Sequence, residues 1–436
     1  DGRAKALLTL SFEGGPLWQL VLAEVRAEMQ PLRQERVADV ESRLAQLHIQ
    51  WTERRALRLA EYETILGTIE LPLGEKDIER SAEAKFHFSS AADELRILDV
   101  EFKARVSATE ARLAKRKVEF EENLKKRVAQ ECARRLACWV YATECRQHGV
   151  TESRAVLTQL GSNRVKSFDA QFPVAHLAAL CDALTQTTYT SKLHLQRAGL
   201  GDDGCIFLGQ QIANERNNFH YLKELELVHN NIGTEGALAL INGILALSNR
   251  TLERLSLAHN ALGDSAALND KLGKALERLL GESAPPALPL TAIDLSGNAL
   301  SVNLAKSIVK GLPRSRLISF SMRYCDWSMS PSIGSKLLAA LRASTYLKVL
   351  DLAFTNLGDC HSGELAALLN GAKCSLTELD ISGNVKLTER ACKSIASALR
   401  VNSSLRTLRM SGCGFGIEGC RNLIDVLDDN CVLENL

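Results

Sequence analysis

The chain has 436 residues, with 53 lysines and arginines, 52 aspartates and glutamates, and a formal net charge of +1. This length can hold two or three domains, and the balanced charge excludes a protein that binds nucleic acid through its overall field. The sequence contains no apolar run of about 18 residues and therefore predicts no membrane-spanning helix.

Four regions follow one another along the chain. Residues 1–16 are irregular and end in a Gly-Gly-Pro triplet, and residues 17–147 have a helical pattern of apolar residues. Residues 148–189 are expected to cap the fold that follows, because a terminal repeat must shield the core from water. Residues 190–436 repeat a leucine frame.

The helical region predicts long helices with a narrow apolar seam between charged faces, the mark of a coiled coil or helical hairpin. Its first seam includes Val37, Val40, Leu44 and Leu47. The second seam, from about residue 90 to 147, includes Leu95, Phe102, Leu113, Phe120 and Leu124. A helix of this length spans roughly 80 Å and needs a partner helix. That partner is either the 17–69 segment folded back or another chain.

Basic residues gather late in this region, at 115–117 and 125–127, with glutamates between them. Two interpretations stay open. The stretch is either a solvated helix face with intrahelical ion pairs, or a contact surface for an acidic polymer such as tubulin or RNA. No aromatic interleaving supports a protein that binds single strands, so we expect protein partners and no nucleic acid or membrane.

The repeat frame places leucines at the first, fourth, sixth and eleventh positions of the stretch 347–357. The fourth position of successive copies falls at residues 193, 225, 255, 293, 320, 350, 379, 408 and 436. The ninth position holds Asn230, Asn260, Asn298 and Asn384, or the smaller Cys325, Thr355 and Cys413. Val165 lies 28 residues before Leu193, which predicts a degenerate first coil within 148–189.

This pattern resembles the leucine-rich repeat signature. Steps near 28 or 29 residues, each with a helix in its second half, resemble the ribonuclease-inhibitor-like subfamily, and the resemblance covers roughly residues 190–436. It implies an α/β fold. The expected architecture is a right-handed solenoid with a parallel sheet on its concave side and helices outside, preceded by long α-helices or a coiled coil.

The twelve cysteines predict reduced side chains in a cytosolic protein. Cys325 and Cys413 stand in the asparagine position of the frame, and Cys205, Cys392 and Cys420 fall early in predicted helices, where small apolar residues pack. No pair has the C-x-x-C spacing of a metal site. We therefore expect a cytoplasmic location.

The sequence predicts no enzyme. It lacks the phosphate-binding loop G-x-x-x-x-G-K-[ST] as well as the G-x-S-x-G and H-E-x-x-H motifs. We expect no catalytic residues, no cofactor and no metal. His229 and His259 are interpreted as polar groups at the edge of the sheet, since no further ligand completes a metal site around them.

The outward positions of the predicted strands define a binding surface on the concave face. It has small side chains and acidic spots, with two aromatic residues as the expected anchors. The candidate partner-binding residues are Glu224, Glu226, Asp294, Tyr324, Asp351, Phe354, Glu378 and Asp380.

Two functions compete. The first is a non-catalytic scaffold for protein–protein interaction, in which the solenoid binds one further protein and residues 17–147 bind helical partners in a larger assembly. Long helices joined to such repeats look like subunits of ciliary or flagellar axonemes, including the repeat subunit of the dynein regulatory complex, which implies a microtubule-associated complex of the cytoskeleton. The alternative is a GTPase-activating protein of the Ran type, which has similar repeats.

Overall fold

The computed structural model describes residues 15–69, 77–168, 172–187, 190–214, 217–246, 251–281, 289–327, 330–370, 375–427 and 430–436. Almost all of the predicted irregular segment 1–16 lies outside the described residues. The chain divides into two compact units, Asp1–Cys132 and Ala133–Leu436. In the part of the chain that the structure describes, no helix combines the length and the apolar character that a bilayer span requires.

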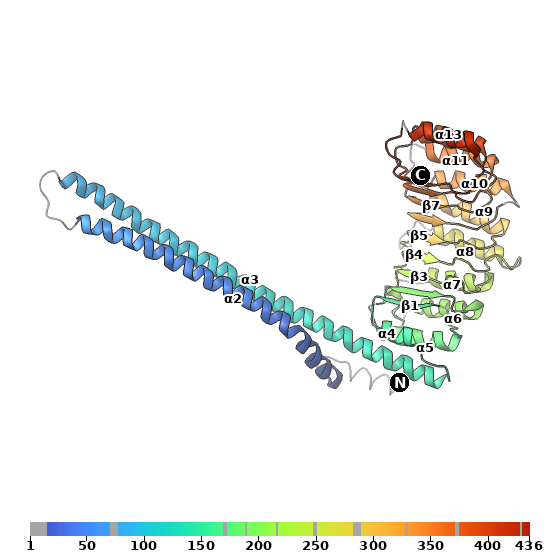
Figure 1. Cartoon of the computed structure of the whole chain (residues 1–436). Helices are drawn as coiled ribbons and strands as arrows, with labels where there is room; N and C mark the ends of the chain where they lie inside the picture. The colour runs from blue at the N-terminus through green and yellow to red at the C-terminus, as the bar shows by residue number, and fades with distance from the viewer. Residues whose placement is uncertain are drawn as a thin grey trace. The chain divides into compact units, whose positions relative to one another are not determined.

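The first unit is a hairpin of two long helices (Figure 1). Helix α2 covers Pro16–Ile69, and helix α3 covers Asp77–Gln147 and continues into the second unit. The second helix therefore begins before residue 90, where the seam pattern starts. Of the two partners that the sequence left open, α2 folded back onto α3 is the one that the structure shows.

Apolar packing holds the hairpin together near the beginning of α2. Val21 and Val25 of α2 pack with Leu124, Val128 and Cys132 of α3, and all five side chains are buried. At full burial each such side chain contributes about 1.5–3 kcal/mol. This cluster contains Leu124 of the predicted second seam.

Aromatic stacking provides a second contact, farther along the hairpin. Trp51 stacks on Phe102 with ring centroids 4.7 Å apart, and Trp51 Nε1 donates a hydrogen bond of 3.2 Å to Asp99 Oδ1. Arg58 pairs with Glu94 at 3.2 Å, but both side chains are about half exposed, so solvent screens this ion pair strongly. Packing therefore sets the register of the hairpin, and charge contributes little to it.

The second unit begins inside α3, at Ala133, whereas the sequence pattern placed the change of region after residue 147. The reason is apolar packing. Ala137, Tyr141 and Cys145 are fully buried and belong to the same core cluster as Val156 of the first coil.

The predicted degenerate coil is present. It consists of α4 (Arg154–Gln159), β1 (Arg164–Phe168) and α5 (Val174–Leu184). Strand β1 pairs in parallel with β2 (Lys192–Gln196), and Val165 lies opposite Leu193, the register that the 28-residue spacing predicts. The apolar core of the solenoid therefore starts at this coil.

Among the described residues, the solenoid contains one parallel sheet of nine strands, which neighbour one another in sequence order from β1 to β9. The helices lie on one side of this sheet (Figure 1). The remaining strands are β3 (Glu224–Glu226), β4 (Arg254–Ser256), β5 (Ala292–Asp294), β6 (Ser319–Ser321), β7 (Val349–Asp351), β8 (Glu378–Asp380) and β9 (Thr407–Arg409). The helices are α6 (Gly201–Ala213), α7 (Thr234–Ala246), α8 (Asn269–Gly281), α9 (Val302–Gly311), α10 (Pro331–Arg342), α11 (Ser362–Asn370), α12 (Glu389–Leu399) and α13 (Gly416–Leu427). Short 3-10 turns lie at η1 (Asn218–Tyr221), η2 (Leu312–Arg314) and η3 (Asp359–His361).

Alternation along each strand sends one residue into the core and its two neighbours outward. Leu225 is fully buried between Glu224 and Glu226, which are partly exposed. We call the outward side of the strands, together with the residues that directly follow each strand, the strand face.

The asparagine position works as predicted. Asn230 Nδ2 donates to Leu195 O at 2.6 Å, and its Oδ1 accepts from Ala198 N at 2.9 Å. In another repeat the smaller Thr355 donates from Oγ1 to Leu352 O at 2.7 Å. These side chains pair backbone groups that would otherwise be buried without a partner. The bonds of Asn230 also tie its coil to the preceding one.

Candidate functional site

The predicted partner-binding residues occupy three places on the strand face. Asp351 on β7, with Glu378 and Asp380 on β8, lies close to Tyr324 and Phe354, which follow β6 and β7. Asp294 lies on the neighbouring β5. Glu224 and Glu226 lie on β3 and form a separate group.

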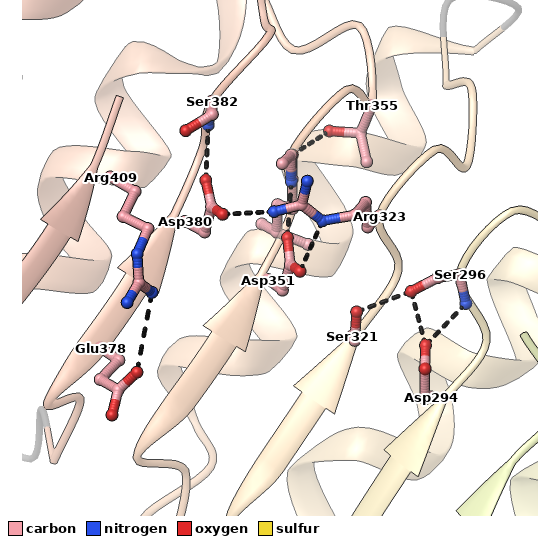
Figure 2. A network of polar contacts seen from close by, with 12 residues as sticks. Asp294, Ser296, Ser321, Arg323, Asp351, Thr355, Glu378, Asp380, Ser382 and Arg409 are labelled. Atoms are coloured by element: carbon pink, nitrogen blue, oxygen red, sulfur yellow. Dashed lines mark hydrogen bonds and ion pairs between the residues drawn. The ribbon is translucent and has the colours of Figure 1, made fainter. Parts of the chain in front are cut away.

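The three predicted aspartates share a local contact that the residue pattern did not reveal. Each accepts a hydrogen bond through Oδ1 from the backbone N–H two residues later, at 3.0 Å for Asp294, 3.0 Å for Asp351 and 2.9 Å for Asp380 (Figure 2). Asp294 also accepts from Ser296 Oγ at 2.5 Å. These carboxylates therefore shape the turn after each strand, and part of their acceptor capacity is used within the fold.

Arg323 connects two of them. Its Nε donates to Asp351 Oδ2 at 2.9 Å, and its Nη2 donates to Asp380 Oδ2 at 2.5 Å (Figure 2). Arg409 approaches Glu378 at 3.8 Å. The two arginines offset much of the negative charge that the sequence pattern assigned to this face. Their position in the frame is readable from the sequence, but the direction of such long side chains is not.

A row of rings runs beside this network. His229, His259, Tyr324 and Phe354 occupy the same position in their repeats, each with a positive φ between 54° and 59°. The rings of Tyr324 and Phe354 stack with centroids 4.6 Å apart, and those of His229 and His259 with centroids 4.4 Å apart. We call these four side chains the aromatic row.

Glycines of the same position make room for the row. A Cβ at Gly297 would lie 2.2 Å from His259 Nδ1, and a Cβ at Gly383 would lie 2.3 Å from Phe354 Cδ1. Rings therefore lean over the glycines beside them. A positive φ in a residue other than glycine is costly, and such strain concentrates at functional sites.

The end of the row formed by Tyr324 and Phe354 is open to solvent. Tyr324 is 48% exposed and Phe354 43% exposed, and the guanidinium of Arg323 lies 5.9 Å and 5.8 Å from their ring centroids. Exposed aromatic side chains beside an arginine are the residue types that dominate protein interfaces. The arrangement provides binding area and includes no paired nucleophile and base among the described residues of the row.

His229 and His259 form the other end of the aromatic row. Burial lowers the pKa of His229, and the neighbouring His259 and Arg197 lower it further. The two imidazole rings stack with their planes 9° apart.

The separate group on β2 and β3 is compact. Lys192 Nζ lies 2.6 Å from Glu224 Oε1, and His194 lies between the two glutamates, 3.1 Å from Glu226 and 3.6 Å from Glu224. Burial raises the pKa of the Glu224 carboxyl, but the bond and charge from Lys192 outweigh this, so the pKa is lower than usual. The ligand atoms of His194, Glu224 and Glu226 lie within 4.8 Å of one another. The sequence pattern named both glutamates but did not bring His194 to them.

Comparisons with known proteins agree with the repeat frame. A family described as "Leucine Rich repeat" matches residues 220–240, 248–268, 343–359, 372–396 and 401–423. Pig "Ribonuclease inhibitor" is 26% identical over 251 residues, which cover 57% of this chain and 52% of the relative. Mouse "NACHT, LRR and PYD domains-containing protein 12" is 27% identical over 304 residues, 69% of this chain and 26% of the relative. Mouse "NACHT, LRR and PYD domains-containing protein 14" is 30% identical over 264 residues, which cover 60% of this chain and 25% of the relative.

The chain thus spans between about a quarter and a half of the length of these curated relatives. Among solved structures, one titled "Crystal structure of TLR13-ssRNA13 complex" has a TM-score of 0.32 and 15% identity, covering 59% of this chain and 31% of that chain. A likeness at this level supports no functional inference.

Proposed function

Because this chain is a leucine-rich repeat protein of the ribonuclease-inhibitor-like type, we propose that it is a non-catalytic scaffold with two binding surfaces. The strand face binds one partner protein, and the helical hairpin joins the protein to a larger assembly. The observation that carries the proposal is the aromatic row: strained, exposed rings beside an arginine provide contact area and no catalytic group. A relative named for inhibiting a ribonuclease likewise acts on another protein.

Tyr324 and Phe354 are the anchors of the proposed interface. A bound partner would bury the exposed surface of both rings. Because the rings already stack on each other, their side chains lose little conformational entropy on binding. The carboxylates of Asp294, Asp351 and Glu378, with Asp380 deeper in the network, form a polar rim. Glu224 and Glu226 extend the interface toward the first coils.

The surface of the hairpin suits a third helix with an acidic face as its partner. Between α2 and α3 lies a cleft of about 380 Å³, and a second of about 310 Å³ lies beside it. Arg116 lines both clefts. The lining of the first cleft also includes Arg36, Val37 and Leu113 with the acidic Asp39 and Glu119, and that of the second includes Arg43 and Arg112, so arginines outnumber acidic side chains in each. A third helix with an acidic face and a few apolar residues would fill the clefts and balance the charge.

The two surfaces can be separated by proximity labelling with the full chain in cells. Tyr324→Ala with Phe354→Ala should remove one set of labelled proteins, and Arg36→Glu with Arg116→Glu should remove a different set. Tyr346→Ala is a matched control, because this tyrosine is 54% exposed and lies outside the aromatic row. The proposal fails if both double variants label the same proteins as the wild-type chain.

The nature of the larger assembly is a narrower proposal. The combination of long helices with this repeat type supports membership of a ciliary or flagellar axonemal complex, such as the dynein regulatory complex. In ciliated cells the tagged chain should then lie along the axoneme. The alternative, a GTPase-activating protein of the Ran type, predicts faster GTP hydrolysis by Ran on addition of the full chain, and an unchanged rate excludes it.

A further inference from the structure

The imidazole of His194 lies between two carboxylates on the strand face. Strand pairing places His194 directly opposite Glu226 and Lys192 opposite Glu224. His194 Nδ1 lies 3.1 Å from Glu226 Oε2, within hydrogen-bond reach, and Nε2 lies 3.6 Å from Glu224 Oε2. His194 is only 5% exposed, and its buried Nε2 has no hydrogen-bond partner in the structure.

This arrangement leaves two electron-pair donors facing each other. A neutral imidazole carries one N–H, and Glu226 accepts it at Nδ1. Nε2 then directs a lone pair toward a carboxylate oxygen at a distance too long for a hydrogen bond. A cation between Nε2 and Glu224 would satisfy both groups.

The separation fits a metal ion. Zinc lies about 2.0–2.1 Å from a histidine nitrogen and about 2.0–2.2 Å from a carboxylate oxygen, so two ligands of a tetrahedral ion are about 3.4 Å apart. His194 Nε2 and Glu224 Oε2 are 3.6 Å apart. Histidine nitrogen combined with carboxylate oxygen suits a borderline cation of this kind.

We propose that His194 and Glu224 bind a divalent transition-metal cation of the zinc type on the strand face, with Glu226 orienting His194. Glu226 holds the Nδ1 proton, the role of a carboxylate behind a metal-bound histidine. Two protein ligands leave further positions for water or for a side chain of a bound partner. This inference does not depend on the aromatic row.

Lys192 sets the strength of the site. Its Nζ lies 2.6 Å from Glu224 Oε1 and leaves the other oxygen, Oε2, toward His194. The ammonium charge opposes a second cation nearby, so we expect Lys192→Met to tighten metal binding. A purely structural role for the cluster predicts no such gain.

The test is calorimetric titration of the full, chelator-treated chain with Zn²⁺ at neutral pH, followed by Co²⁺ absorption spectra. Glu224→Gln and His194→Asn should each weaken one binding event by at least about tenfold. His229→Ala with His259→Ala is the matched control. It removes the two stacked histidines elsewhere on this face and should leave the Zn²⁺ binding event unchanged. The Co²⁺ spectrum of the event should lack the intense thiolate band that cysteine ligands produce.

Metal-free thermal melts check that each variant folds. Should the buried His194→Asn variant fail to fold, Glu224→Gln carries the test, since glutamine keeps the size and shape of the glutamate side chain. The proposal is overturned if Glu224→Gln binds Zn²⁺ as the wild-type chain does, or if every binding event shows thiolate absorption.

Discussion

The substitution Arg323→Met tests whether the guanidinium stabilises the neighbouring carboxylates of Asp351 and Asp380 on the strand face. The substitution keeps much of the aliphatic stem and removes the guanidinium. Asp351 and Asp380 lie opposite each other on β7 and β8, and Arg323 donates to both. Without the guanidinium, two neighbouring carboxylates have no cation between them, and we expect the folded state to lose stability.

The magnitude follows from the contacts. A hydrogen bond to a charged group contributes about 1.5–3 kcal/mol. The side chains of Arg323 and Asp351 are 32% and 25% exposed, so solvent reduces this value. Repulsion between the remaining carboxylates adds about 1 kcal/mol in a partly solvated setting. The expected loss in free energy of unfolding is about 2–4 kcal/mol.

The assay is urea unfolding of the full chain at neutral pH. Adding Asp351→Asn to Arg323→Met should restore part of the stability, because it removes one of the two facing carboxylate charges. Arg421→Met is the control, since Arg421 pairs with Glu418 on an exposed helix surface. A loss below about 0.5 kcal/mol for Arg323→Met would refute the reasoning.

Three further predictions concern the frame, the aromatic row and the hairpin. Asn298→Ala should lower the free energy of unfolding by about 2–4 kcal/mol, because its buried amide donates to three backbone carbonyls, and Asn298→Thr should cost less; urea melts check both. Gly383→Ala should lower the free energy of unfolding by about 1–2 kcal/mol, since φ is 72° there and the new Cβ would displace the Phe354 ring. The near-ultraviolet circular dichroism spectrum should change with the ring position, and an unchanged spectrum would contradict this prediction. Phe102→Ala should speed amide exchange in the helix segment around Trp51 and leave residues 190–436 unchanged.

The repeat frame was predictable because it depends on local rules. Alternation buries Leu225 and Leu350, and equal spacing sets Val165 opposite Leu193. The asparagine position also follows, since a buried turn must pair its backbone groups wherever it occurs. These features need no knowledge of which side chains meet across the surface.

The candidate site was less predictable for the opposite reason. The pattern placed Asp351, Asp380 and Tyr324 on the strand face, but it could not show that Arg323 links the two aspartates. The long side chain has many rotamers, and only the packed neighbours select one. For the same reason the sequence named Glu224 and Glu226 without placing His194 between them.

The helices show a third limit. The apolar seam predicts that α3 (Asp77–Gln147) packs against a partner helix. Seam residues such as Phe102 do not show whether that helix belongs to the same chain or to another one. The structure answers this with Trp51 of α2. The boundary between the two units lies inside α3 for a related reason. Tyr141 continues the helical apolar pattern, but its side chain packs in the core of the solenoid, and the pattern alone does not show this.

Site-directed photocrosslinking tests the central claim most directly. A photoreactive phenylalanine analogue would replace Tyr324, Phe354 or the control Tyr346 in the full chain, one at a time, in cells. We expect discrete crosslinked partners from positions 324 and 354 and none of these species from 346. Equal products from all three positions, or none from 324 and 354, would contradict a partner-binding role for the strand face.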